Sequence, residues 1–397
     1  MPNKGILPLA GLTVVAIEQA VAAPLATRHL ADWGARVIKI ERPGTGDFAR
    51  GYDTRVKGLS SYFVWLNRTK ESLTLDLKRP EAGEVVAKLI ASADILVHNL
   101  APGAMDRLGF GNAAMRAQHP RLIMCAVSGY GSSGPYRDRK AYDLLIQSEA
   151  GLLSVTGTPE APAKAGISVA DIAAGMYAYS AILTALVRRS TTGDGAAIEV
   201  SMLDALGEWM SHPIYATTYG AAPLPRSGAR HAAIAPYGPF SAGDGGSVYL
   251  GIQNEREWLR FCSDVIAQPA LAKDSRFVNN SLRVENRETL EELINTVFAT
   301  LATPEIVARL DAADIAQARL NTVEEFATHP QLAARNRWRE IDSPAGPLRA
   351  LLPPVMMDAL EPAMGAVPAL GAQTQAILET LGYDSATIAG WREAGVI

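Results

Sequence analysis

The sequence has few cysteines and lacks the segments that mark a secreted or membrane-spanning protein. Its two cysteines, Cys125 and Cys262, have apolar neighbours, which is typical of core residues in a reducing compartment rather than of a disulfide or a zinc site. The N-terminus carries no hydrophobic signal segment. The longest uncharged apolar run, residues 172–187, is shorter than the roughly 18 residues that a membrane span needs. We therefore expect a soluble cytoplasmic protein.

The sequence also lacks a large excess of one charge sign and the common motifs that bind metals or nucleotides. The formal net charge is only -4, with no long run of one sign, so binding of nucleic acid through a basic face is not expected. The six histidines show no metal-ligand spacing, and P-loop, H-E-x-x-H and G-x-S-x-G motifs are absent. Residues 129–134 match G-x-G-x-x-G, but Pro135 and a polar stretch follow instead of the apolar helix of a dinucleotide fold. Carboxylates remain as the main catalytic candidates.

Short apolar runs alternate with helical patterns in the first part of the chain. With 48% hydrophobic residues, the 397-residue chain can build a large core and suggests two domains. Strands are expected at residues 12–17, 36–40, 95–97 and 122–127, and helices at 24–34, 80–92 and around 115–118. This alternation predicts an α/β fold, with a Rossmann-like open parallel sheet that has helices on both faces.

Ligands of such sheets bind outside the carboxyl ends of the strands. The expected strand ends carry polar residues: Glu18 and Gln19, Glu41 and Arg42, His98 and Asn99, and Ser128 and Gly129. We therefore expect a binding site at this edge.

The composition changes after about Tyr219. Residues 220–247 are rich in Gly, Pro and Ala, and a β-hairpin is expected around a turn at 243–246. Helical patterns follow at about 254–266, 287–301 and 303–313, and another at 372–381. We expect a large α/β domain formed by 1–215 and 325–397, and a small α+β domain formed by 226–320, with linkers between them.

Asp171 precedes an unusually apolar helical pattern. From Ile172 to Val187 no residue is charged, so a buried helix is expected, with Asp171 at or just before its first turn. A carboxylate there meets the free N–H groups and the positive end of the helix, so the simplest interpretation is an N-cap. The helix is too apolar for an ordinary surface helix, however, and a partly buried carboxylate indicates a functional residue.

Several motifs match one family when they are taken together. They are P-L-A-T-R-H-L-A-D-W-G-A-R-V-I-K-I-E-R-P-G-T-G-D at 24–47, L-N-R-T-K-E-S-L-T-L-D at 66–76, N-L-A-P-G-A-M-D-R-L-G at 99–109, S-G-Y-G-S-S-G-P at 128–135, A-Y-D-L-L-I-Q at 141–147, and T-G-D-G-A-A-I-E-V-S-M-L-D-A at 192–205. With the Asp171 segment, they resemble the class III CoA-transferase family, which includes formyl-CoA transferase, carnitine CoA-transferase and alpha-methylacyl-CoA racemase. The resemblance runs from Leu9 to Ile397.

The resemblance implies a mechanism and an assembly. Asp171 matches the nucleophile of the family, which attacks a thioester to give an aspartyl anhydride and then an aspartyl-CoA thioester. Backbone N–H groups at the helix start could stabilise the oxyanions that develop. Coenzyme A thioesters are then substrates, with no permanently bound cofactor and no metal. Family members form homodimers in which two ring-like subunits interlock, so a homodimer is expected.

The CoA contacts that the resemblance implies are mostly basic or amide side chains. Arg42, Arg107 and Lys140 match residues that meet the nucleotide and its phosphates, and Asn67, Lys70 and Asn99 line the same site. Taken singly, each Lys or Arg is more often a solvated surface charge.

Tyr142 separates the two chemistries of the family. The racemases carry G-H-D where this chain has Ala141-Tyr142-Asp143, and a phenol with an ordinary pKa near 10 is a poor general base at neutral pH. Transferases have Tyr here, so Tyr142 joins Asp171 as a catalytic candidate, although a packed core phenol is an equal alternative. The other functions considered are an acyl-CoA racemase or epimerase, and a non-catalytic CoA-binding subunit, which would not need Asp171.

The expected lid region departs from the formyl-CoA transferase pattern. Residues 223–235 contain only Gly228 in place of a tetraglycine loop. Arg226, Arg230 and His231 lie in this stretch and could clamp a charged acceptor, although a solvated linker is an alternative. We expect succinyl-CoA or a similar donor, and a small dicarboxylate acceptor of the succinate, malate, citramalate, itaconate or mesaconate type.

Overall fold

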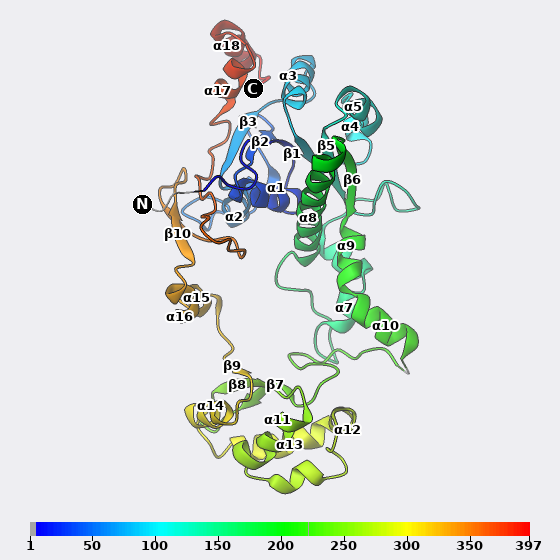
Figure 1. Ribbon diagram of the computed structural model, residues 1–397, viewed down its shortest axis with the longest axis vertical. Coiled ribbons are helices and arrows are strands. Elements are labelled where there is room, and N and C mark those ends of the chain that lie inside the picture. The colour runs from blue at the N-terminus through cyan, green and yellow to red at the C-terminus, as the bar shows by residue number, and fades with distance from the viewer. Residues whose placement is uncertain (1–4, 221) are drawn as a thin grey trace. The chain divides into compact units, whose positions relative to one another are not determined.

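The computed structural model describes residues 5–220 and 222–397, and the chain divides into two compact units (Figure 1). The first unit contains the chain up to Ala150, together with Ala165–Ser211 and Ala334–Ile397. The second contains Gly151–Lys164 and His212–Ala333. Residues 151–164 thus belong to the second unit, whereas the sequence placed them within the large domain. The assignment of a CoA-binding role to the large domain stays a proposal.

The first unit is built on a parallel sheet of six strands in the order β3-β2-β1-β4-β5-β6. The strands are β1 (Thr13–Ile17), β2 (Arg36–Glu41), β3 (Lys70–Thr74), β4 (Ile95–His98), β5 (Ile123–Ser128) and β6 (Ala196–Ser201). The predicted parallel α/β fold is confirmed. Four strands lie within one residue of their expected bounds, while β3 and β6 were not expected as strands.

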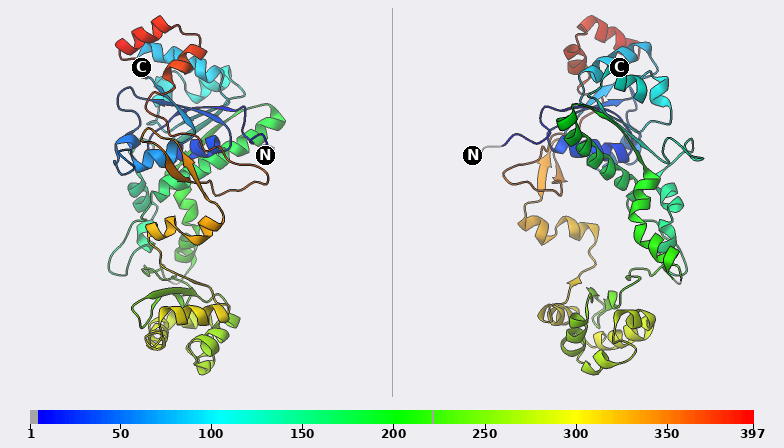
Figure 2. Two further views of the ribbon diagram at one scale, coloured as in Figure 1. Left: turned by 90° about the vertical axis from the view of Figure 1, so that its left-hand side faces the viewer. Right: turned by 45° about the vertical axis from the view of Figure 1, so that its right-hand side comes forward.

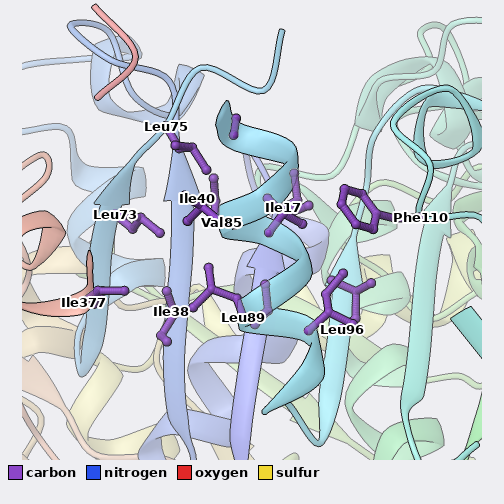
Figure 3. Close-up of a cluster of buried hydrophobic side chains, with 14 of the residues drawn as sticks. Ile17, Ile38, Ile40, Leu73, Leu75, Val85, Leu89, Leu96, Phe110 and Ile377 are labelled. Atoms are coloured by element: carbon purple, nitrogen blue, oxygen red, sulfur yellow. The ribbon is translucent and has the colours of Figure 1, made fainter. Parts of the chain in front are cut away.

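Helices cover both faces of this sheet (Figures 1 and 2). Helices α1 (Ala22–Asp32) and α8 (Val169–Thr192) pack on one face, and α3 (Pro80–Ala91) packs on the other. On the α3 face, Val85 and Leu89 contact Ile17, Ile38 and Ile40 of the strands (Figure 3). Residues of α17 (Thr374–Thr380) and α18 (Ser385–Glu393) complete this cluster, so the C-terminal segment belongs to the core of the first unit.

Helix α8 confirms the apolar helix expected after Asp171, and it lies very close to α1. A Cβ atom added to Gly175 would come within 2.6 Å of the backbone oxygen of Ala22, so the two helices begin side by side. By length and composition α8 could cross a membrane, but 39% of that window is buried, and the helix packs against α1, β5 and β6. This packing is that of a core helix in an α/β unit.

The second unit is a small α+β fold. A three-stranded antiparallel sheet has the order β7-β8-β9, with β7 (Tyr237–Ser241), β8 (Ser247–Gly251) and β9 (Gln317–Ala318). The expected hairpin turn at residues 243–246 connects the first two strands, which confirms that prediction. The core of the second unit includes buried side chains of α11 (Glu255–Arg260), α13 (Arg287–Phe298) and α14 (Thr303–Ala312).

The remaining elements are short. They are η1 (Phe48–Gly51), α2 (Ser61–Asn67), α4 (Ala104–Arg107), α5 (Asn112–Gln118), α6 (Asp143–Glu149), α7 (Leu152–Val155), α9 (Met202–Trp209), α10 (Ser211–Tyr219), η2 (Phe261–Val265), η3 (Pro269–Lys273), α12 (Asn280–Glu285), α15 (Val323–Ala327), α16 (Pro330–Ala334), β10 (Trp338–Ile341) and β11 (Leu348–Leu351). The two cysteines are buried and free.

Candidate active site

Asp171 is the third residue of α8, so it is not the N-cap. Ser168 occupies the cap position, and its side chain makes no capping hydrogen bond. The cap comes instead from Asp143, the first residue of α6, whose Oδ1 accepts hydrogen bonds from the backbone N–H of Ala170 at 2.8 Å and of Asp171 at 3.4 Å. The interpretation of Asp171 as the N-cap is therefore wrong, because the side chain that caps α8 is that of Asp143.

The backbone donors of the first turn of α8 are all engaged. They belong to Val169, Ala170, Asp171 and Ile172. The first and last of these donate to carbonyl oxygens of the residues just before the helix, and the middle two donate to Asp143. The expectation that the helix start supplies N–H groups to an oxyanion is therefore wrong in this structure.

Burial and charge repulsion act together on Asp171. Desolvation by burial, followed by the negative charge of Asp143, raises the pKa of Asp171 from an ordinary 3.8 to about 7. A carboxylate whose pKa lies near neutrality holds its proton more strongly than an ordinary aspartate and is a stronger nucleophile when ionised. Such a shift, at the start of a core helix, is typical of a functional group.

Two tyrosines share the electrostatic surroundings of Asp171. Burial raises the pKa of Tyr52, and the charges of Asp47 and Asp171 and the phenol of Tyr142 raise it further, so all three groups act on the Tyr52 hydroxyl. Tyr142 itself is 69% exposed and immediately precedes Asp143 at the start of α6. The structure thus brings the two expected catalytic residues into one neighbourhood, with Tyr142 at the surface rather than in the core.

A strained turn after β1 lies against the same region. Ala20 has a left-handed backbone, with φ 64°, and its N–H donates to Asp47 Oδ1 at 2.9 Å. Asn99 holds the preceding residue, Gln19, by two hydrogen bonds, one from the Gln19 N–H at 2.9 Å and one to the Gln19 carbonyl at 2.8 Å. The next residue, Val21, belongs to a cluster that contacts Ile172 of α8. Asn99 therefore holds the main chain of this turn in place.

Two of the expected CoA contacts are buried in an ionic cluster. Lys70 Nζ lies 2.7 Å from Glu18 Oε1 and 3.1 Å from Asn67 Oδ1, and both Lys70 and Asn67 are buried. Burial lowers the pKa of Lys70 to about 8, against the opposing pull of Glu18. The polar atoms of Lys70 and Asn67 are thus used inside the protein, which differs from the direct contact with CoA that the sequence motif implied.

The other three expected basic contacts are exposed. Arg42 follows β2 and Lys140 lies two residues before Tyr142, and both are exposed. Arg107, on α4, is also exposed, with Nη1 at 3.5 Å from the carbonyl oxygen of Pro102. These three cations are accessible to an anionic ligand.

The basic residues of the expected lid are engaged within the second unit. Arg226 donates to the carbonyl oxygens of Thr158 and Pro159, both at 2.8 Å. Arg230 pairs with Glu291 at 2.7 Å. His231 stacks on Tyr237 with ring centroids 5.2 Å apart. Because Arg226, Arg230 and His231 make these contacts, they are not free to clamp a charged acceptor. The type of acceptor acid that we propose therefore does not depend on them.

Sequence reasoning missed the residues that organise the site. Asp143 lies in the A-Y-D motif, and a polar residue directly before the apolar run 144–146 was the available signal for it. Tyr52 and Asp47 left no periodic signal, because both lie in the irregular segment around η1. Among the residues that the structure describes, no group of three or more His, Cys, Asp or Glu side chains could hold a metal ion.

Comparisons with known proteins identify the family of this chain. A sequence model of the family described as "CoA-transferase family III" matches residues 9–374. The acyl-CoA transferase of Fusarium pseudograminearum is 34% identical over 98% of this chain and 88% of its own, and human succinyl-CoA:glutarate CoA-transferase is 31% identical over 99% and 91%. A crystal structure of a CaiB/BaiF family protein from Brucella suis superposes with TM-score 0.82 at 32% identity, covering 95% of this chain and 100% of that one.

Proposed function

Since the chain belongs to CoA-transferase family III and is a CoA-transferase, we propose that it moves CoA from succinyl-CoA, or a similar thioester, to a small dicarboxylic acid. The observation that carries this proposal is Asp171, a carboxylate at the start of α8 whose pKa is raised to about 7. The glutarate specificity in the name of the human relative supports a dicarboxylate acceptor. The CoA thioester is a substrate here, and no permanently bound cofactor is proposed.

The proposed reaction exchanges acyl groups on Asp171. The ionised carboxylate attacks the donor thioester, giving a mixed anhydride and CoA thiolate. The thiolate attacks the aspartyl carbonyl, releases the donor acid and leaves an aspartyl-CoA thioester. The acceptor carboxylate attacks this thioester, giving a second anhydride and CoA thiolate. Attack of the thiolate on the acceptor carbonyl then forms the new acyl-CoA and restores Asp171.

The surroundings of Asp171 suit these intermediates. Ile172 packs against a buried apolar cluster of Val21, Leu25 and Leu66, which limits the access of water to that side of an anhydride. We propose that the exposed cations Arg42, Arg107 and Lys140 bind the CoA phosphates. Asn67, Lys70 and Asn99, which are held by contacts within the protein, would act by shaping the site.

The proposal is tested by assaying the purified protein alone with succinyl-CoA and a panel of mono- and dicarboxylic acids. We expect new acyl-CoA products from dicarboxylates, detected by mass spectrometry. A 2-methylacyl-CoA incubated in D₂O should keep its α-hydrogen, because Tyr142 stands where the racemases carry the histidine that moves the α-proton. Deuterium incorporation at the rate of CoA transfer would support the racemase alternative instead.

A homodimer with interlocked subunits remains part of the proposal. The first unit exposes apolar side chains along α8 and α9: Met176, Tyr177, Val187 and Trp209. A groove of about 730 Å³ is lined by residues of α8, α9 and β6, and β6 is an edge strand of the sheet. Exposed apolar surface of this kind is typical of an interface. Sedimentation at low micromolar concentration should give about twice 42.2 kDa, and a stable active monomer would contradict the dimer.

A further inference from the structure

We propose that Asp143 is a positioning residue, which anchors the first turn of α8 and places a second carboxylate against the reacting carboxylate of Asp171. The proposal rests on the proposed function, in which Asp171 is the nucleophile. Its basis is geometric: a side chain of α6 reaches across to cap the helix that carries Asp171.

Asp143 is itself rigidly held. Its Oδ2 accepts a hydrogen bond of 2.6 Å from Nε2 of Gln147, one helical turn further along α6. Gln147 is fully buried, and its Oε1 accepts a hydrogen bond of 3.0 Å from the N–H of Ala165. The chain from Ala165 to Asp171 is thereby fixed at both ends by one hydrogen-bonded pair, Asp143 and Gln147. A nucleophile needs this kind of support, because small displacements reduce rates strongly.

The cap also changes the charge that Asp171 experiences. The free N–H groups of a helix start favour a negative charge placed near them, and they would normally stabilise an ionised Asp171. Asp143 takes two of these groups and adds a charge of the same sign. Both effects favour the protonated form of Asp171, and they add to the effect of burial, which is the largest cause of its raised pKa.

Other titratable groups share the surroundings of Asp171. They include the phenols of Tyr52, which follows η1, and of Tyr142, which directly precedes α6, and the carboxylate of Asp47. The charge that acts directly on Asp171 is that of Asp143. Removal of this charge should therefore be visible in the titration of Asp171, whereas loss of a purely structural contact should not.

The test compares Asp143→Asn with wild type across pH. The amide oxygen of asparagine can still accept hydrogen bonds from the two backbone N–H groups. The negative charge is gone, and the amide nitrogen cannot accept the hydrogen bond from Gln147 Nε2. We expect an acid limb of kcat near pH 7 in wild type, and we expect it to move down by about one pH unit in Asp143→Asn. Asp143→Ala also removes the cap and should lower kcat by on the order of 100-fold. The matched control is Asp384→Asn, since Asp384 caps α18 through the N–H of Thr387.

A rate that falls equally at every pH, with the acid limb unmoved, would overturn the charge role and leave Asp143 as an ordinary cap. A second measurement does not depend on turnover. The carboxyl ¹³C resonance of Asp171, assigned in aspartate-labelled protein by comparison with Asp171→Asn, should titrate at lower pH in Asp143→Asn. If Asp171→Asn kept full activity, the proposed function would fail, and the carboxyl titration would still decide whether Asp143 acts on Asp171.

Discussion

Replacement of Asp171 by alanine is expected to lower the rate of CoA transfer by at least about 10³-fold, as the loss of a covalent nucleophile does in other enzymes. The effect is large because every proposed intermediate is an acyl derivative of this one carboxylate. No other carboxylate can replace it from the same helix turn, since Asp171 is the acidic residue of the first turn of α8.

The variant should nevertheless fold. The Asp171 N–H would still donate to Asp143, and the packing of Gly175 against α1 does not involve the carboxylate. Asp194→Ala is the matched control, because Asp194 is exposed beyond the other end of α8 and should leave transfer unchanged. Hydroxylamine added with acyl-CoA should convert Asp171 of the wild-type protein to a hydroxamate. Normal turnover by Asp171→Ala would rule out Asp171 as the nucleophile.

The ionised carboxylate of Asp171 should lower the free energy of unfolding. The sign of this effect follows from its raised pKa in the folded protein. The pKa of Asp171 is about 7 in the folded protein and 3.8 ordinarily, so between these values the folded state binds more protons than the unfolded state. Stability contributed by Asp171 therefore falls as pH rises through this window. Asp171→Asn should raise the melting temperature by a few degrees above about pH 7 and have little effect near pH 4.

The apolar pattern of the sequence predicted those strands of the parallel sheet whose buried side chains are apolar. The runs at β1, β2, β4 and β5 are rich in Val and Ile, and their bounds were expected to within one residue. Helix α8 was likewise expected because its apolar run is long. These elements bury hydrocarbon side chains, which is the property that periodicity detects.

The two missed strands differ in what they bury. On β3, the alternate residues Lys70, Ser72 and Thr74 are buried polar residues, so the strand lacks the usual apolar signal. On β6, alanines occupy part of an edge strand in which only the last two residues are buried. Periodicity cannot predict a strand whose buried partners are ions or whose faces are half exposed.

The candidate site was predicted only at its centre. The apolar helix identified Asp171 from composition alone, but the partner that caps this helix comes from a different helix. The burial of Lys70 depends on Glu18, which is 52 residues away in the sequence. Contacts of this kind arise from the folded sheet and leave no local pattern, so a lysine in a motif is easily taken for an exposed ligand contact.

The second large effect is expected at Lys39, in the middle of β2. Lys39 is completely buried, and its Nζ lies 2.7 Å from Asp47 Oδ2 and 3.4 Å from Glu18 Oε1. Burial alone lowers the pKa of Lys39, but the charges of Glu18, Asp47 and Glu41 raise it above its ordinary value, so it is a cation in the folded protein. Together with Lys70, it supplies the positive charge of a cluster of carboxylates between the sheet and α1.

Lys39→Met should destabilise the protein by about 3–5 kcal/mol, because it leaves the buried carboxylate of Asp47 without its cation and removes one of the two lysines beside Glu18. The control is Arg36→Met on the same strand. Arg36 pairs with Glu71 at 2.8 Å, but their side chains are 45% and 30% exposed, so this loss should cost no more than about 1 kcal/mol. The urea midpoint of the full chain, followed by circular dichroism, measures both losses. Equal losses in the two variants would contradict a dominant role for the buried cluster.

A double variant separates lost charge from lost packing at Lys39. Asp47→Asn removes the nearest negative charge, while its amide oxygen can still accept from the N–H groups of Ala20 and Ala49. If uncompensated charge is the main cost, Lys39→Met combined with Asp47→Asn should be less destabilised than the sum of the two single variants. Additive losses would instead assign the effect of Lys39→Met to packing.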